Sequence, residues 1–287
     1  MQANRKLKEE ISINSQLKLL TQAYQEHAIV QINLARFSVV SSREFMEELA
    51  EIFFNVKTSY ELYLKALKAR SKKHYDDRLE KNGREVIILL SSNGKFYGDL
   101  VTKVSRMFIQ EAKNKNVDLV IVGREGKSFY DDSGVKKPYA YFEIPDTNIT
   151  LDILKPLIDS IIPYKKVTIF YGKFANIITQ EPVKTSLTGD MQDDKGDKPH
   201  EDYLFEPSVE NIMEFFESQI FSMLLNQTVN EGKLARFASR IKAMEFAQNN
   251  LQKQLDWLIG RQRRLRGMEI NKKQLQLFAG RSLWNKK

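Results

Sequence analysis

Two glycine-containing turns in the middle of the chain carry the residue types that bind phosphate groups. Ser91–Gly98 (SSNGKFYG) follows one apolar run, and Gly123–Lys127 (GREGK) follows another. Glycine lets backbone N–H groups approach a phosphate closely, and a neighbouring lysine supplies positive charge. Neither turn has the spacing of GxxxxGKS/T or GxGxxG, and Lys95 is misplaced for either motif. We therefore interpret both as strand-to-helix turns, with phosphate binding as the alternative.

Acidic pairs and histidines form no catalytic pattern in this sequence. Asp131–Asp132 and Asp193–Asp194 lie in loop-like stretches, whereas a catalytic acid pair needs a desolvated cleft to separate its pKa values. The chain has no cysteine, which excludes disulfides and thiol catalysis, and its three histidines (His27, His74 and His200) are isolated. We predict no catalytic, cofactor-binding or metal-binding residue.

The positive charge is concentrated at one end. The net charge is +8. From Arg261 to Lys287 there are nine basic residues and one acid, Glu269, so the rest of the chain nets to about zero. Such a segment indicates an acidic partner, either protein or nucleic acid. Aromatics for base stacking are absent beside Arg261–Arg266, so we favour a protein, and salt-dependent nucleic-acid binding is the less favoured alternative.

A heptad pattern precedes and overlaps this basic end. Within Leu234–Met268, ten positions from Leu234 to Leu265 recur at alternating intervals of three and four. Eight of them are apolar, the other two are Gln248 and Gln262, and no proline interrupts the run. At about 1.5 Å per residue this stretch makes a helical rod on the order of 50 Å long. A single apolar stripe needs a partner helix to bury it. The predicted coiled-coil seam consists of Leu234, Phe237, Ile241, Met244, Leu251, Leu255, Leu258 and Leu265.

The N-terminal part is also predicted to be helical, because no glycine or proline occurs before Gly83. A first seam of mixed polarity and a second, more apolar one follow each other, with Ser41–Ser42 marking a change of register. The first contains Ile13, Leu17, Leu20, Tyr24, His27, Gln31 and Leu34, and the second contains Phe45, Leu49, Ile52, Val56, Tyr60, Tyr63 and Leu67.

The middle of the chain alternates strands and helices with glycine turns, which predicts a parallel sheet. The expected strands are Val86–Leu90, Val117–Val122, 139–144, Val167–Tyr171 and Ala175–Thr179, and the expected helices are 99–114 and 150–162. The acidic, glycine-containing stretch 186–202 is predicted to be a mobile loop.

The predicted fold is therefore of the α/β class with three parts. Residues 1–75 form an N-terminal coiled-coil helix, residues 81–200 an α/β domain, and residues 205–285 a C-terminal coiled-coil helix. We expect the two terminal helices to meet as a long antiparallel coiled coil, with a Rossmann-like α/β domain inserted between them.

Several strings, in this order, resemble the gamma subunit of F-type ATP synthases over nearly the full length. Ser91–Gly98 stands where the family has an SSDRGLCG-like string, and Val122–Tyr130 is similar to its VGRKG…FF segment. The further matches are Phe170–Phe174 with Thr179–Pro182 (YNKF…QxP), Tyr203–Ser208 (YxxEPS) with Glu217–Phe221 continuing it, Arg240–Met244 with Ala247 and Asn250 (ARMxAMxxAxxN), and Phe278–Gly280 (xAG).

The resemblance implies a non-catalytic rotor shaft that transmits torque during ATP synthesis coupled to proton transport. The implied partners are three alpha and three beta subunits, an epsilon-like subunit and a membrane ring or another mechanical partner; no nucleic acid is expected. ATP, ADP and magnesium are expected on the partner subunits, and this chain binds no cofactor. The implied location is cytoplasmic and peripheral, on the inner face of the cell membrane.

The resemblance also implies where the shaft meets its partners. Residues at the implied rotor–stator interface are Arg240, Met244, Asn250, Arg261, Arg263, Arg264, Arg266 and Phe278, and an apolar end (Leu275, Leu277, Phe278, Leu283 and Trp284) would turn in a bearing.

Several positions depart from the family pattern. Gly94 and Lys95 replace an Arg-Gly pair, and Arg236 stands where a glutamate is usual. Gly267 and Lys273 likewise replace a glutamine and a glutamate, and only Thr21 and Ala23 match the family's TKAM segment. The alternative is therefore a gamma-like rotor of a divergent F-type-like ATPase, as in mycoplasmas, that drives another machine such as gliding motility.

Overall fold

The computed structural model describes residues 4–36, 82–187 and 209–284. They belong to two compact units, one combining Met1–Ala28 with Ile241–Lys287 and the other comprising Ile29–Arg240. The units cut across the three predicted parts, because the first unit combines both ends of the chain. The predicted seam from Phe45 to Leu67 lies outside the described residues. So do His74, His200, Asp193–Asp194 and most of the predicted loop 186–202.

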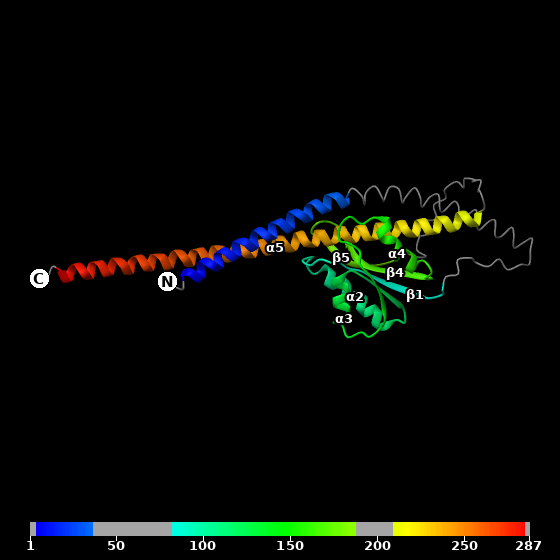
Figure 1. Cartoon of the computed structure of the whole chain (residues 1–287), viewed down its shortest axis with the longest axis horizontal. Coiled ribbons are helices and arrows are strands. Elements are labelled where there is room, and N and C mark those ends of the chain that lie inside the picture. Colours follow the sequence, from blue (N-terminus) through cyan, green and yellow to red (C-terminus); the bar gives the residue numbers. More distant parts are fainter. Residues whose placement is uncertain (1–3, 37–81, 188–208, 285–287) are drawn as a thin grey trace, which may run out of the picture. The chain divides into compact units, whose positions relative to one another are not determined.

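A five-stranded sheet forms the centre of the second unit (Figure 1). Its strand order is β3-β2-β1-β4-β5, in which β5 is antiparallel to β4 and all other neighbours are parallel. The inner strands consist of consecutive branched apolar residues, as is typical of strands buried on both faces. The strands are β1 (Glu85–Leu90), β2 (Asp118–Val122), β3 (Tyr139–Phe142), β4 (Lys166–Phe174) and β5 (Gln180–Ser186).

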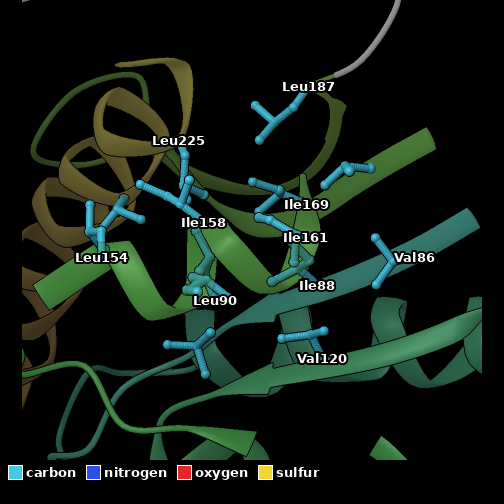
Figure 2. Close-up of a cluster of buried hydrophobic side chains, with 14 of the residues drawn as sticks. Val86, Ile88, Leu90, Val120, Leu154, Ile158, Ile161, Ile169, Leu187 and Leu225 are labelled. Atoms are coloured by element: carbon cyan, nitrogen blue, oxygen red, sulfur yellow. The ribbon is translucent and has the colours of Figure 1, made fainter. Parts of the chain in front are cut away.

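Helices cover both faces of this sheet, because alternate strand residues point to opposite sides. Val86, Ile88 and Leu90 face α4 (Leu151–Ile161) and Leu225 of α5 (Val209–Trp284), as Figure 2 shows. The intervening residues face α2 (Leu100–Asn114) and α3 (Arg124–Asp131); this second core contains Ile87, Leu89, Phe108, Tyr130, Phe170 and Ala235. The predicted parallel sheet between helices is therefore present.

One predicted strand is wrong. Ala175–Thr179 is not a strand but the hairpin connection between β4 and β5. The Asn176 side chain accepts hydrogen bonds from the backbone N–H groups of Ile178 (2.9 Å) and Thr179 (2.8 Å). This local bond competes with strand pairing and turns the chain back on itself. The final strand consequently begins at Gln180.

In the first unit, residues 4–28 of the N-terminal helix (4–36) lie beside the part of α5 that begins at Ile241. The Lys18 Nζ donates a hydrogen bond to Gln252 Oε1 (2.6 Å), and Gln248 Nε2 donates one to Gln25 Oε1 (2.7 Å). The two helices therefore run in opposite directions along each other. On α5, every member of the predicted seam is buried or half-buried: Leu234 and Phe237 in the second unit, and Ile241, Met244, Leu251, Leu255, Leu258 and Leu265 in the first.

The predicted first seam of the N-terminal helix is wrong. Leu17 is 44% exposed, and Ile13, Leu20 and Leu34 are more exposed still. The packed positions form a neighbouring stripe with the same intervals, which contains Leu7, Ile11, Asn14, Lys18, Thr21, Gln25 and Ala28. Lys18 and Gln25 pair with side chains of α5, whereas Asn14 and Thr21 donate to carbonyl groups of their own helix, so each polar member has a partner. A search for apolar periodicity overlooks a stripe of this composition.

Candidate functional site

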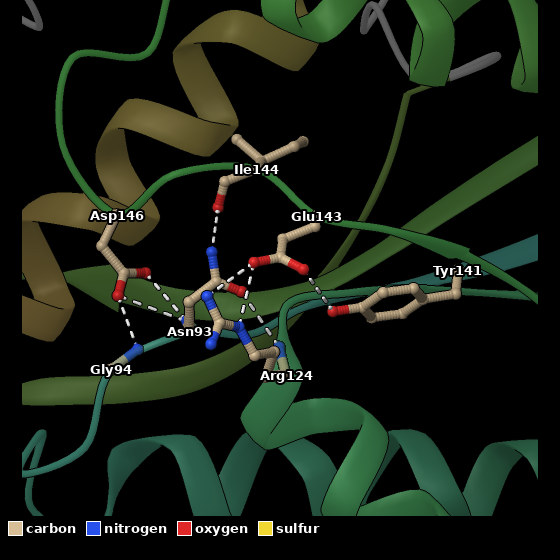
Figure 3. A network of polar contacts seen from close by, with 7 residues as sticks. All are labelled: Asn93, Gly94, Arg124, Tyr141, Glu143, Ile144 and Asp146. Carbon is tan, nitrogen blue, oxygen red and sulfur yellow. Dashed lines mark hydrogen bonds and ion pairs between the residues drawn. The ribbon is translucent and has the colours of Figure 1, made fainter.

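The carboxyl ends of β1, β2 and β3 meet at one edge of the sheet. Figure 3 shows the network of polar contacts among residues at this edge. In open parallel sheets this edge is where ligands bind. The turn Ser91–Gly98 follows β1, Gly123 separates β2 from α3, and Glu143–Asp146 follows β3. Ser91–Gly98 and Gly123–Lys127, the two stretches with residue types that bind phosphate, therefore lie at the edge where open parallel sheets bind ligands.

Asp146 occupies the backbone donors of the first turn. Its carboxylate accepts hydrogen bonds from the N–H groups of Asn93 (3.1 Å to Oδ1 and 3.2 Å to Oδ2) and Gly94 (2.7 Å to Oδ2). Consecutive backbone N–H groups of this kind bind anions, and here the anion is a side chain of the same chain. The Asn93 side-chain amide also donates to Ile144 O (2.8 Å).

The second turn is filled in the same way. The backbone N–H groups of Arg124 and Glu125 donate to Asn93 Oδ1 (3.1 Å) and Ser92 O (2.9 Å). The Arg124 guanidinium pairs with the Glu143 carboxylate, with its Nε at 2.9 Å and its Nη2 at 2.8 Å from Oε1. These N–H groups at the start of α3 already have internal acceptors, which favours a structural role over phosphate binding at both stretches. The second connection is shorter than predicted, because only Gly123 lies between β2 and α3 and residues from Arg124 onward are helical.

The turn after β1, at the same edge, also contacts α5. The Arg240 Nη2 donates to Lys95 O (2.7 Å), and the guanidinium carbon lies 3.8 Å from the centre of the Tyr97 ring. Ser239 Oγ donates to Tyr97 O (2.7 Å), and the Phe237 ring meets Tyr97 edge to face at 5.7 Å. The turn therefore contacts α5 through directed polar and aromatic contacts.

The Tyr97 side chain is buried within these contacts, and its pKa reflects them. Burial is the main cause that raises the pKa of Tyr97 to about 12; the negative charge of Asp146 acts in the same direction, while Arg240 and Arg236 oppose it. A hydrogen bond between the Tyr97 hydroxyl and the Asp146 carboxylate adds to the increase. The phenol is consequently a neutral donor at physiological pH.

The residues predicted for the rotor–stator interface are not gathered in one place. Arg240 is buried beneath the turn, and Met244 is buried in the first unit. The remaining members are exposed on α5: Asn250, Arg261, Arg263, Arg264, Arg266 and Phe278. The interface itself stays a prediction. The side chains of Leu283 and Trp284 lie outside the part that the structure describes.

Contrary to the prediction, an aromatic side chain does lie beside the basic group Arg261–Arg266. Trp257 lies one helical turn before Arg261, and the guanidinium lies 5.4 Å from the centre of the indole ring. The ring remains 56% exposed. The sequence contains the signal for this contact, because residues four apart on a helix, such as Trp257 and Arg261, are neighbours on its surface.

The described residues contain neither a catalytic acid pair at Asp131–Asp132 nor a metal-binding cluster. Asp131 is the last residue of α3 rather than part of a loop, and it accepts a hydrogen bond from the Tyr139 hydroxyl (2.9 Å). Over residues 4–36, 82–187 and 209–284, no group of three or more His, Asp or Glu side chains is placed to hold a metal ion. In the same ranges, no helix has both the length and the apolar composition needed to span a bilayer.

The described residues combine a long C-terminal helix with an α/β domain whose sheet is mostly parallel. The solved central stalk of the Tetrahymena thermophila mitochondrial ATP synthase has the same fold: the superposition has a TM-score of 0.57 at 16% identity and covers 79% of this chain and 99% of that one. The family model described as ATP synthase matches residues 3–281. The chain therefore belongs to the ATP synthase family.

Curated relatives support the same assignment. The ATP synthase gamma chain of Halothermothrix orenii is 24% identical over 98% of both chains. The ATP synthase gamma chain of Ruthia magnifica is 23% identical over 87% of this chain and 88% of its own. The resemblance to the gamma subunit of F-type ATP synthases is confirmed, and the comparisons give no support to a motility machine.

Proposed function

We propose that this chain is the gamma subunit of an F-type ATP synthase, the central shaft that transmits torque between a catalytic head and a membrane sector. The observation that carries the proposal is the family match over residues 3–281, together with relatives named ATP synthase gamma chain that align over almost their full length. We infer that the chain is a non-catalytic subunit and that nucleotide chemistry takes place on its partners.

The shaft is proposed to be an antiparallel coiled coil of the two ends of the chain. The opposed direction of the Lys18–Gln252 and Gln25–Gln248 pairs supports this arrangement, as does the burial of Ile241, Met244, Leu255 and Leu258 on α5. Two packed helices resist bending better than one, and stiffness is what a torque-bearing rod requires.

A shaft biases its partners only if its faces differ. Different orientations then make different contacts, and the contact energy shifts the conformational equilibrium at each nucleotide site. At about 100° per residue, the exposed Phe246, Trp257, Arg261 and Arg264 share one face of α5, roughly opposite the buried seam. This face carries both large apolar groups and cations, so it differs in character from the rest of the helix. We propose that this basic group, Arg261–Arg266, meets acidic surfaces of the head.

The proposed partners are three alpha and three beta subunits, an epsilon-like subunit and a membrane ring. ATP, ADP and magnesium would bind to the alpha and beta subunits. The corresponding location is cytoplasmic, peripheral on the inner face of the membrane. Exposed apolar residues near the end of α5, including Leu275, Leu277 and Phe278, are expected to be covered in the complex.

Co-purification tests the proposal. The full chain, expressed with candidate alpha and beta subunits, is expected to yield a complex with one copy of this chain per three alpha and three beta subunits. Removal of residues from Arg261 onward is expected to reduce torque or assembly more than nucleotide affinity. Failure to recover any such complex contradicts the proposal, and a collapse of nucleotide affinity in the truncated complex contradicts the division of labour.

Charge reversal tests the basic group separately. We expect Arg261→Glu with Arg264→Glu to weaken association with the head by about tenfold at low salt, with a smaller effect at high salt. Lys113→Glu with Lys136→Glu makes the same charge change at exposed positions of the α/β domain and serves as the control. Equal losses in both variants would mean that net charge, rather than this surface, governs association.

A further inference from the structure

The turn that follows β1 contacts α5 at two adjacent residues. Ser239 donates to Tyr97 O, and Arg240 donates to Lys95 O, both at 2.7 Å. Neighbouring residues on a helix point about 100° apart, so the turn contacts α5 from two directions. Rotation of the helix about its axis therefore breaks or strains both hydrogen bonds.

The other contacts between α5 and the sheet are mostly apolar. Phe221, Leu225 and Val229 pack into the core shared with α4. Such contacts hold the helix against the domain, but they have no directional preference and oppose rotation or sliding less than hydrogen bonds do. A further polar contact joins the Tyr171 hydroxyl to Glu231 Oε2 at 3.3 Å.

The turn itself is held in shape from the opposite side. Asp146 binds the N–H groups of Asn93 and Gly94. A Cβ at Gly94 would lie 3.1 Å from Asp146 Oδ2 and 3.5 Å from Arg240 Nη2, so glycine leaves room for both groups. Phe96 (φ 69°) and Gly98 (φ 63°) have left-handed backbone conformations, which a loosely held turn would not maintain at phenylalanine.

We propose that Asp146, the turn 93–98 and Arg240 form a torsional lock that makes the α/β domain and α5 turn as one body. The inference rests on the rotor function proposed above. Arg240 of α5 positions the turn, because its guanidinium lies over the Tyr97 ring and donates to Lys95 O. Asp146, which follows β3, binds the other end of the turn and so connects it to the sheet. Torque passes through these directed contacts rather than through the apolar core alone.

Hydrogen exchange tests the lock without any assumption about rotation. In the full chain, Arg240→Gln is expected to raise amide exchange in the turn 93–98 by about tenfold, because a hydrogen bond from a charged donor is lost. Asp146→Asn is expected to act in the same direction. Arg124→Gln serves as the control, because it removes the ion pair to Glu143 at the same edge and no hydrogen bond or ion pair among the described residues joins the Arg124 side chain to α5. Unchanged exchange in Arg240→Gln overturns the inference.

Rotation of the assembled complex tests the mechanical consequence. A cysteine introduced at Lys136 of the α/β domain is unique, because the chain has none, and it carries a bead. With Arg240→Gln or Asp146→Asn, ATP hydrolysis is expected to continue while the torque at the bead falls several-fold; Arg124→Gln is expected to behave like the wild type. If Arg240→Gln does not assemble, Ser239→Ala removes only one hydroxyl donor and gives the same comparison.

The outcomes separate the two proposals. Normal torque in the variants that assemble overturns the lock and leaves the rotor function standing. Absence of rotation in the wild-type complex overturns the rotor function, while the exchange result still decides whether the turn depends on Arg240.

Discussion

Gln25 and Gln248, separated by 223 residues in the chain, are joined by a 2.7 Å hydrogen bond between their side-chain amides. Both residues are half-buried at the contact between the N-terminal helix and α5. A polar pair in such a position stabilises little by itself but costs free energy when one partner is removed.

Gln248→Leu is therefore expected to lower the free energy of unfolding by about 1–2 kcal/mol, because the Gln25 oxygen loses its donor. The double variant with Gln25→Leu is expected to recover most of this loss. Urea unfolding of the four chains of the cycle measures the effect. Gln254→Leu, at an exposed position of α5, is the control; an equal loss there would show that the amide pair is not the cause.

The packed stripe of the N-terminal helix makes a second prediction. Leu7 is 3% exposed, whereas Leu17, one turn into the predicted seam, is 44% exposed. Leu7→Ala is expected to cost about 2–4 kcal/mol of unfolding free energy, and Leu17→Ala less than about 0.5 kcal/mol. Thermal unfolding of the isolated full chain distinguishes them. If Leu17→Ala lowered the unfolding free energy more than Leu7→Ala, the seam predicted from the apolar spacing would be the packed one after all.

Gly123 supplies a third prediction. Its φ is 94°, and a Cβ there would lie 2.8–2.9 Å from backbone atoms of Ser92. Gly123→Ala is expected to destabilise the α/β domain by about 3 kcal/mol, from strain and close contact together. Gly134→Ala is the matched control, because Gly134 also has a positive φ (73°) but nothing within 4 Å of its Cβ, so about 1 kcal/mol is expected. Equal losses would leave strain as the only cause.

The Tyr97 phenol makes a prediction about pH. Burial raises its pKa from 10.0 to about 12, so the folded chain holds this proton more tightly than the unfolded chain does. The associated stabilisation is complete below pH 10 and is lost as the pH rises from 10 to 12. We expect Tyr97→Phe to fall less steeply in stability over this interval. Urea unfolding at several alkaline pH values measures the slope, and identical slopes would contradict the assignment.

The sequence was sufficient to predict the elements with strong local signals. The runs after Glu85 and Asp118 are long and branched enough to be read as buried strands, and the seam of α5 has a regular apolar period. Ala175–Thr179 was misinterpreted because Asn176 redirects the backbone with its side chain. On the N-terminal helix, the apolar spacing predicts that large residues such as Leu17 and Leu20 form the contact with α5. Small and polar residues such as Thr21 and Ala28 are packed instead, and their spacing gives no apolar signal.

The candidate site was only half predictable. Glycines and apolar runs are local features, so the sequence alone predicts that both stretches connect a strand with a helix. Asp146 was not identified, since it lies 52 residues beyond Gly94 and only the parallel order of β1, β2 and β3 brings it there. The role of Arg240 at the turn depends on the same tertiary arrangement.

The carboxylate of Asp146 has a consequence for the cell as well as for the fold. A diffusible phosphate or nucleotide would have to displace a group that is tethered at the same donors and therefore has a high effective concentration. The geometry of this edge is consequently set by the chain and does not follow the rise and fall of metabolite levels.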